Sequence, residues 1–166
     1  AFISGNIFIY RFIYFVMKLK KHVYCRHSSD YEIPFFDVDS IKIMWHGNYV
    51  KYLEMARCAF LEKIGYTYDR MIELGYGWPI VQLNLKYVKP AFFRQKIRVN
   101  LALVEYETCM RIDYTIVDIA SGKKLTTGST TQVAVDLKTH EMQFQSPSCW
   151  RSAVENCDDF TPAPHV

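Results

Sequence analysis

Apolar and polar residues alternate along much of the second half of the chain. Apolar side chains fall mainly at every second position in four stretches, namely Val81 to Tyr87, Ile97 to Leu103, Met110 to Ile116 and Thr131 to Leu137. Such alternation is typical of strands that have one buried and one solvated face in an antiparallel sheet. The connections between these stretches are short, which favours hairpins over helical crossovers. The pattern therefore predicts four antiparallel strands, with a turn at Ser121-Gly122 before the last one.

The pattern changes to a helical period in the segment from Asn48 to Ile64. The apolar residues that recur at this spacing are Tyr49, Leu53, Ala56, Phe60 and Ile64. Gly47 and Asn48 are candidate caps at the start of this helix, and Gly65 stands where a helix stop is expected. Apolar residues occupy much of the helix circumference, which predicts a helix largely wrapped by other structure.

Three shorter elements complete the predicted order. A helical turn is expected from Tyr68 to Leu74, capped by Thr67 and ended by Gly75. Residues 31–36 are aromatic and predict a strand, in which Pro34 indicates an edge position. Residues 37–40 predict a turn, because short polar side chains bond their own backbone there. A strand, a long helix and then four strands predict an α+β domain with one curved antiparallel sheet.

Residues 1–17 differ from the rest of the chain. They are strongly apolar but are interrupted by Asn6 and Arg11, and they fall short of the roughly 20 apolar residues of a membrane-spanning helix. Positive charges follow this stretch, whereas a secretory signal carries them before it. We expect residues 18–166 to form a single domain and residues 1–17 to be an apolar extension. Membrane association of the extension and a natural start at Met17 stay open as alternatives.

Composition narrows the class of protein. The chain has 166 residues, 50% of them hydrophobic, and a net charge of +3, which suits a folded domain and gives no indication of nucleic-acid binding. Its five cysteines are odd in number and form no C-x-x-C pair. This favours reduced thiols in the cytoplasm over a disulfide scaffold or a metal site. Neither a metal nor a redox cofactor is therefore expected.

The segment from residue 37 to residue 57 carries a motif, DVDSIKIMWHGNYVKYLEMAR. It has a D-x-D turn, then an aromatic residue with His, then N-Y at the start of a helix that continues to E-x-A-R. The segment resembles the signature of the 4-hydroxybenzoyl-CoA thioesterase family. Weaker likeness extends downstream to a Y-x-x-P at Tyr87 and Pro90 and to a V-x-V-D ending at Asp136.

The resemblance implies a fold, an assembly and a substrate. The fold is the hotdog, in which a curved antiparallel sheet wraps a long central helix. Members of the family act as homodimers or homotetramers with active sites at the dimer interface. Their substrates are acyl-CoA thioesters, and an acyl carrier protein is an alternative acyl donor. The acyl group itself stays open.

The resemblance also implies roles for single residues. Asp39 would be the catalytic carboxylate, acting as nucleophile or as general base. The backbone amides of His46 and Gly47, at the positive end of the helix, would stabilise the oxyanion. Asn48, Tyr49 and Glu54 are candidates for substrate binding. Their structural alternatives are a helix cap for Asn48, a core position for Tyr49 and an ion pair with Arg57 for Glu54.

One departure from the family motivates competing functions. Family members usually carry Ala-Gly or Gly-Gly between the second Asp and the aromatic residue, whereas residues 40–44 here read SIKIM. Glycine permits unusual backbone angles and close approach to a ligand, so its loss affects the expected loop. The alternative is a module that binds acyl-CoA or an acyl carrier protein without hydrolysis. A dehydratase would need a different motif, and a nucleophilic Cys58 would need a His partner.

Overall fold

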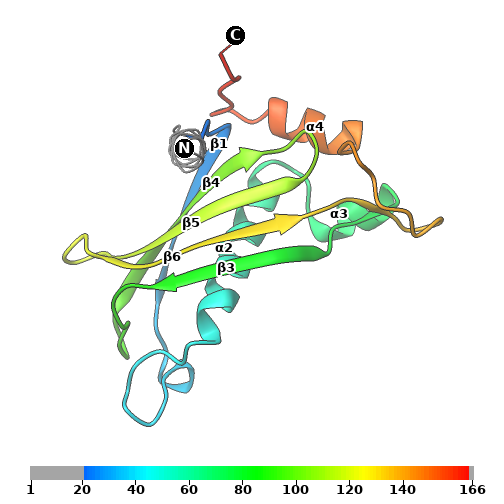
Figure 1. The fold of residues 1–166 in the computed structure, drawn as a ribbon. Coiled ribbons are helices and arrows are strands. Elements are labelled where there is room, and N and C mark those ends of the chain that lie inside the picture. Colours follow the sequence, from blue (N-terminus) through cyan, green and yellow to red (C-terminus); the bar gives the residue numbers. More distant parts are fainter. Residues whose placement is uncertain (1–20, 165–166) are drawn as a thin grey trace, which may run out of the picture.

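The computed structural model of the chain describes residues 21–164, so the predicted extension at residues 1–17 lies outside the described part. Five antiparallel strands form the main sheet, in the order β1-β4-β5-β6-β3 (Figure 1). These strands are β1 Cys25–Glu32, β3 Ile80–Tyr87, β4 Lys96–Glu105, β5 Met110–Asp118 and β6 Lys124–Gln132. A separate pair is formed by β2 Tyr76–Gly77 and β7 Val135–Asp136. The helical elements are η1 Phe35–Asp37, α2 Asn48–Lys63, α3 Tyr68–Glu73 and α4 Ser148–Glu155.

Strands β4 and β5 supply the centre of the core. Their buried positions alternate as predicted and comprise Ile97, Val99, Leu101 and Leu103 in β4 and Met110, Ile112, Tyr114 and Ile116 in β5. The register places Val99 opposite Ile116 and Leu101 opposite Tyr114. Directly opposed residues share a face of the sheet, so one continuous apolar surface faces the long helix.

Helix α2 lies along that apolar surface (Figure 1). It begins at Asn48, and Gly65, with φ of 68°, follows its last turn, so the predicted start and stop are confirmed. Its buried residues are Tyr49, Tyr52, Leu53, Ala56, Arg57, Phe60 and Leu61. The opposite side, including Lys51 and Met55, is exposed. Within residues 21–164 the sheet therefore covers the apolar side of the helix, and the side that carries Lys51 and Met55 is open.

The short helix after α2 also matches its prediction. Helix α3 begins at Tyr68, and the side chain of Thr67 accepts the N–H of Arg70 at 3.3 Å. This is the capping bond expected of a threonine in that position. Gly75, with φ of 86°, ends the segment in a left-handed conformation that glycine adopts readily.

Strand β3 is an edge strand and is poorly covered on both faces. Val81 is 58% exposed and Leu83 is 40% exposed, although the sequence pattern predicts one buried face. Leu85 lies opposite Gly128 of β6, where an added Cβ would come within 2.8 Å of the leucine side chain. Glycine therefore lets β3 and β6 approach here, but α2 does not reach far enough to cover the rest of β3.

Two predicted strands are misplaced. The first strand runs from Cys25 to Glu32, and Phe35–Asp37 forms a 3₁₀ turn, so the strand predicted at residues 31–36 is wrong in both bounds. Pro34 follows the strand because its ring and missing N–H do not fit the ladder. The last sheet strand is Lys124–Gln132, and residues 133–137 leave the main sheet to pair with β2. The buried residues around that boundary are Thr130, Gln132 and Ala134, so the predicted apolar face of Thr131, Val133, Val135 and Leu137 is not the buried one.

The sequence did not predict helix α4. It closes the end of the domain opposite the D-x-D segment (Figure 1). Its Trp150 is fully buried and donates its indole N–H to the carbonyl of Tyr106 at 2.9 Å. The ring packs against Tyr66 and Trp78, with both centroid distances at 5.3 Å. No helix among residues 21–164 is long and apolar enough to cross a bilayer.

Candidate active site

Asp37, the first carboxylate of the D-x-D motif, is buried and fully engaged. It is 3% exposed, it accepts the hydroxyl of Tyr52 at 2.6 Å, and it forms an ion pair with Lys51. Its backbone carbonyl accepts the N–H of Trp45 and the side-chain amide of Asn48, both at 2.9 Å. Asp37 therefore ties the loop that follows it to the first turns of α2.

Asp39, the second carboxylate, lies in a small loop that closes on itself. Its N–H donates to the carbonyl of Ile43, and its carbonyl accepts the N–H of Lys42, both at 2.9 Å. Asp39 Oδ1 accepts the N–H of Ile41 at 2.9 Å, as in the predicted turn. Among residues 21–164, Oδ2 has no protein donor. One carboxylate oxygen is therefore fixed and the other is free.

The loop of residues 40–44 adopts its shape without the glycines that members of the 4-hydroxybenzoyl-CoA thioesterase family usually carry there. Lys42 has φ of 63°, in the left-handed region that glycine occupies readily and that lysine rarely adopts. The hydrogen bonds between Asp39, Lys42 and Ile43 hold this conformation. The absence of glycine in residues 40–44 leaves the loop conformation unpredicted by the sequence. In the structure Lys42 takes the left-handed conformation, which is strained for lysine and would be relaxed for glycine.

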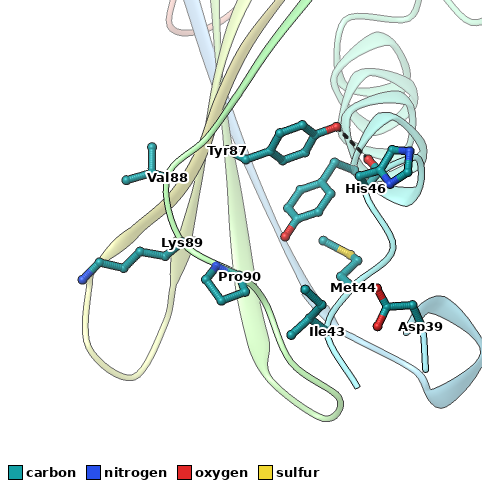
Figure 2. Close-up of a pocket in the computed structure, with 9 residues that line it drawn as sticks. Asp39, Ile43, Met44, His46, Tyr87, Val88, Lys89 and Pro90 are labelled. Carbon is teal, nitrogen blue, oxygen red and sulfur yellow. Dashed lines mark hydrogen bonds between the residues drawn. The ribbon is translucent and has the colours of Figure 1, made fainter. Parts of the chain in front are cut away.

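The start of α2 presents two backbone amides. The carbonyl of Trp45 accepts the N–H of Asn48 at 2.9 Å, and the carbonyl of His46 accepts the hydroxyl of Tyr87 at 2.8 Å (Figure 2). Because a peptide unit is planar and trans, these bonds also fix the directions of the His46 and Gly47 N–H groups. Within residues 21–164 neither N–H donates to a protein acceptor. Such unpaired donors at a helix start are suited to bind negative charge.

Asp39, His46 and Tyr49 come together in one pocket of about 280 Å³. Its other lining residues are Ile43, Met44, Tyr87, Val88, Lys89 and Pro90 (Figure 2). Tyr49 is 3% exposed, its hydroxyl accepts the N–H of Ala91 at 3.3 Å, and burial raises its pKa. It thus stays a neutral phenol that forms part of the pocket wall.

The side chains at positions 45–47 give His46 and Gly47 different surroundings from those predicted. The imidazole of His46 packs on the ring of Trp45, with centroids 4.7 Å apart, and makes no hydrogen bond within the described residues. Any side chain at position 47 would collide with the same indole. The missing side chain of Gly47 therefore makes room for the indole of Trp45.

Comparison with known proteins decides the family. The model of the thioesterase-like superfamily matches residues 33–164. The chain belongs to this superfamily. Its sequence is similar to a putative acyl-CoA thioesterase of Bacillus subtilis, with 27% identity over 79 residues, which are 48% of this chain and 57% of the relative. The chain thus spans little more than half the length of that curated relative.

Solved structures of thioesterases share the fold. The structure of a DHNA-CoA thioesterase from Staphylococcus aureus is 27% identical and covers 70% of this chain and 78% of its own, with a TM-score of 0.65. A 4-hydroxybenzoyl-CoA thioesterase complexed with its 4-hydroxybenzoyl-CoA ligand has a TM-score of 0.69 at 18% identity and covers 78% and 98% of the two chains. The predicted α+β hotdog fold and the predicted family relationship are confirmed.

Asn48 and Glu54 lie outside the pocket of this superfamily member. Asn48 directs its side-chain amide to the carbonyl of Asp37 and makes no capping bond. Glu54 forms the predicted ion pair with the buried Arg57 and accepts the hydroxyl of Tyr68 at 2.6 Å. Cys58 donates to the same carboxylate. These contacts favour structural roles over the substrate-binding roles that the sequence analysis assigned to Asn48 and Glu54.

Residues 87–90 line the pocket, although the sequence did not predict that they contribute to the site. They follow β3 and meet the D-x-D loop because Met44 donates its N–H to the carbonyl of Ala91 at 2.7 Å. The Y-x-x-P likeness contained the signal, since Tyr87 and Pro90 both line the pocket. Only the tertiary fold joins that segment to a loop more than 40 positions earlier in the chain.

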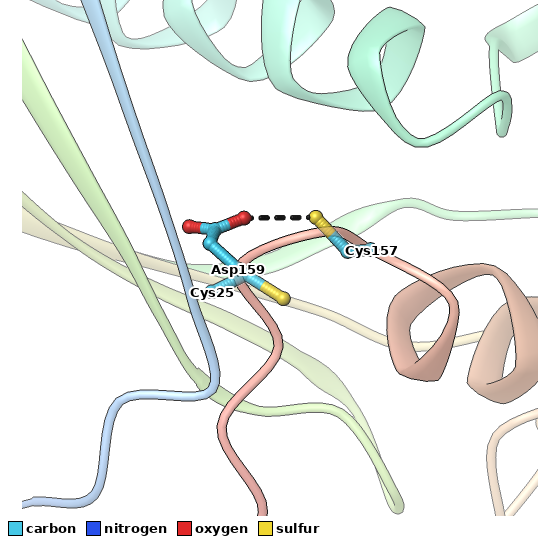
Figure 3. A group of neighbouring side chains, drawn as sticks. All are labelled: Cys25, Cys157 and Asp159. Carbon is cyan, nitrogen blue, oxygen red and sulfur yellow. Dashed lines mark hydrogen bonds between the residues drawn. The ribbon is translucent and has the colours of Figure 1, made fainter.

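A cluster at the other end of the domain offers metal-ligand atoms. Cys25, Cys157 and Asp159 place their sulfur and oxygen atoms within 4.8 Å of one another (Figure 3). Cys157 donates to Asp159 at 3.0 Å, and burial raises the pKa of Cys25 to about 12. The ammonium of Lys63 lies 2.7 Å from Asp159 and already supplies a positive charge. These features suit neutral thiols around a salt bridge.

Proposed function

We propose that this chain hydrolyses acyl-CoA thioesters to the free acid and CoA. The observation that carries the proposal is the free oxygen of Asp39 in a pocket that is also lined by His46, whose backbone amide at the start of α2 is unpaired within residues 21–164. Hydrolysis needs an oxygen nucleophile or a base, together with donors for the oxyanion. Asp39 attacks the thioester carbonyl or takes a proton from water. The amides of His46 and Gly47 stabilise the developing negative charge.

The remaining pocket residues suit the acyl part of the substrate. Ile43, Met44, Val88 and Pro90 give it apolar walls, and the ring of Tyr49 adds an aromatic one. The names of the Bacillus and Staphylococcus proteins support an acyl-CoA substrate. An acyl carrier protein is the alternative acyl donor, since it presents the same thioester on a phosphopantetheine arm.

The release of free thiol from a panel of acyl-CoA substrates tests this function. We expect Asp39→Asn to lower kcat by about 10²-fold or more, because the amide cannot act as nucleophile or base. Asp158→Asn removes an equal charge at the opposite end and should retain full activity. Full activity of Asp39→Asn would refute the role of this carboxylate. Binding of acyl-CoA without thiol release by the wild type would favour the non-hydrolytic module.

We also propose that the chain forms a homodimer through β3. This strand pairs with β6 on one side, and within residues 21–164 its other edge is unpaired. Its apolar side chains, Val81 at 58% and Leu83 at 40% exposure, extend beyond the cover of α2. An unpaired apolar edge is a template for a second strand, and pairing with a second copy would cover both the edge and these side chains.

Sedimentation velocity on the full chain tests the dimer. Val81→Glu places a charge within the proposed interface, so we expect a monomer. Ile72→Glu adds the same charge at a 64% exposed site on α3 and should leave the dimer intact. A monomeric wild type, or a dimer that survives Val81→Glu unchanged, would contradict this interface.

A further inference from the structure

A second pocket adjoins the candidate active site across residues 88–90. It has a volume of about 240 Å³, and Lys89 and Pro90 line both pockets. Its other lining residues are Phe92, Gln95, Asp118, Ser121, Lys123 and Leu125. Figure 2 shows the side chain of Lys89 extending away from Asp39 and His46. The short segment that ends β3 thus separates a pocket with a carboxylate from a pocket with lysines.

The charges around the second pocket are mainly positive. The two connections at this end of the sheet, together with the strand residues that flank them (residues 86–96 and 118–124), contain six cations and a single acid, Asp118. The β4–β5 connection with its flanking residues, 105–110, contains two acids and no cation. These segments therefore differ in charge, and the positive ones include the pocket that adjoins Asp39.

The lysines of this pocket are available to a ligand. Lys89 and Lys123 are exposed, and neither forms an ion pair within residues 21–164. Asp118 is already engaged, because it accepts hydrogen bonds from Ser121 and from Gln95 at 3.0 Å. These bonds hold its pKa below the usual range. The acid is thus committed to the turn, and the ammonium groups remain to attract an external anion.

The chemistry of CoA corresponds to the different linings of the two pockets. Its thioester lies at one end of a long pantetheine arm, and its phosphates and adenine lie at the other. A ligand of this kind needs an apolar pocket with catalytic groups beside a positively charged one. Phe92 is 50% exposed at the second pocket and offers an aromatic face to a base. Lysine ammonium groups are suited to bind phosphate as point charges.

We propose that the pocket around Lys89 and Lys123 binds the phosphate groups of the CoA moiety. The inference rests on the proposed function, because it assigns the second end of the same substrate. It makes the site selective for CoA thioesters over thioesters of pantetheine alone. Both lysines act in binding, and Lys123, which lines the second pocket and not the Asp39 pocket, affects KM without affecting the chemistry at Asp39.

The binding of CoA itself tests this pocket without any need for turnover. Isothermal titration calorimetry would compare the full-length wild type with the double variant Lys89→Gln/Lys123→Gln. We expect the double variant to bind CoA about tenfold more weakly, because two exposed charge contacts are lost. Lys138→Gln removes a lysine from the exposed segment that follows β7 and should bind CoA like the wild type. Equal affinity in all three proteins would overturn the proposal, as would absence of CoA binding by the wild type.

Kinetics with two matched substrates separate this inference from the proposed hydrolysis. The same acyl group is offered on CoA and on pantetheine. We expect Lys123→Gln, at a residue that lines the second pocket and not the Asp39 pocket, to raise KM for the CoA thioester about threefold and to leave KM for the pantetheine thioester and both kcat values unchanged. Equal increases in KM for both substrates would overturn the phosphate site. Lysine-dependent CoA binding in a protein that releases no thiol would support the phosphate site and refute hydrolysis.

Discussion

Asp37 and Asp39 are two residues apart, yet the regions around them are built in opposite ways. Asp37 is buried, and both its carboxylate and its carbonyl bind groups of α2 or of the segment before it. Asp39 is partly exposed, and its carboxylate accepts one hydrogen bond, from the N–H of Ile41. The carboxylate of Asp37 is thus fully used in contacts that stabilise the fold, whereas Asp39 keeps one carboxylate oxygen free for a ligand. A D-x-D motif can thus combine an anchor with a reactive group, because the anchor fixes the position of its neighbour.

The difference predicts separate effects on stability. We expect Asp37→Ala to lower the free energy of unfolding by about 2 kcal/mol, because it leaves the buried hydroxyl of Tyr52 without an acceptor and Lys51 without a partner. Asp39→Ala should change it by about 0.5 kcal/mol, as expected for a residue with one turn bond. Urea denaturation followed by circular dichroism measures both values. Equal losses would show that the two carboxylates do not differ in this way.

A second variant sharpens the comparison on the side of activity. Tyr87 orients the peptide between His46 and Gly47 through a 2.8 Å hydrogen bond, yet its side chain is 50% exposed. We expect Tyr87→Phe to lower kcat about tenfold, since the oxyanion donor loses its fixed direction, and to change stability by less than about 1 kcal/mol. Tyr76→Phe removes a hydroxyl from β2 as a control. An unchanged kcat would show that the amide needs no such support.

Asp159 gives an intermediate case, because it is paired but partly exposed. Burial alone would raise its pKa, but hydrogen bonds from Cys157 and Lys63 outweigh burial and lower the pKa to about 2, from 3.8. Its contribution to stability is therefore complete above pH 3.8 and is lost as the pH falls towards 2. We expect Asp159→Asn to lower the free energy of unfolding by about 0.5 kcal/mol at neutral pH. The free energy of unfolding of the variant should also fall less steeply than that of the wild type between pH 3.8 and pH 2. Urea denaturation at a series of pH values measures this difference, and equal pH dependence of the free energy of unfolding in wild type and variant would contradict the lowered pKa.

The local pattern predicted the centre of the fold well. Alternation identified β4 and β5, because nearly every second residue of these strands is buried in the core. Helical spacing with Gly65 and Thr67 located the start and end of the helices. Alternation failed at residues 131–137, where the chain leaves β6 and pairs with β2, and where the buried residues are Gln132 and Ala134 and not the apolar set at odd positions. A local pattern of apolar residues does not show where a strand leaves one sheet for another pairing.

The candidate site was predicted in part. The motif located Asp39, His46 and Tyr49, which line one pocket. It also suggested Asn48 and Glu54, whose contacts depend on Asp37 and Arg57 and could not be read from spacing along one helix. The wall supplied by residues 87–90 comes from a distant part of the chain. Tertiary contacts of this kind leave no trace in local periodicity.

The position of Trp45 has an optical consequence. The chain contains three tryptophans. Trp78 and Trp150 are at most 7% exposed, whereas Trp45 is 49% exposed and lies over Gly47 and beside His46. Buried indoles emit at shorter wavelengths than hydrated ones, so the red side of the intrinsic fluorescence spectrum comes mainly from Trp45. The protein therefore carries a native fluorophore at the start of α2, and we expect its emission to change when a ligand contacts the neighbouring His46.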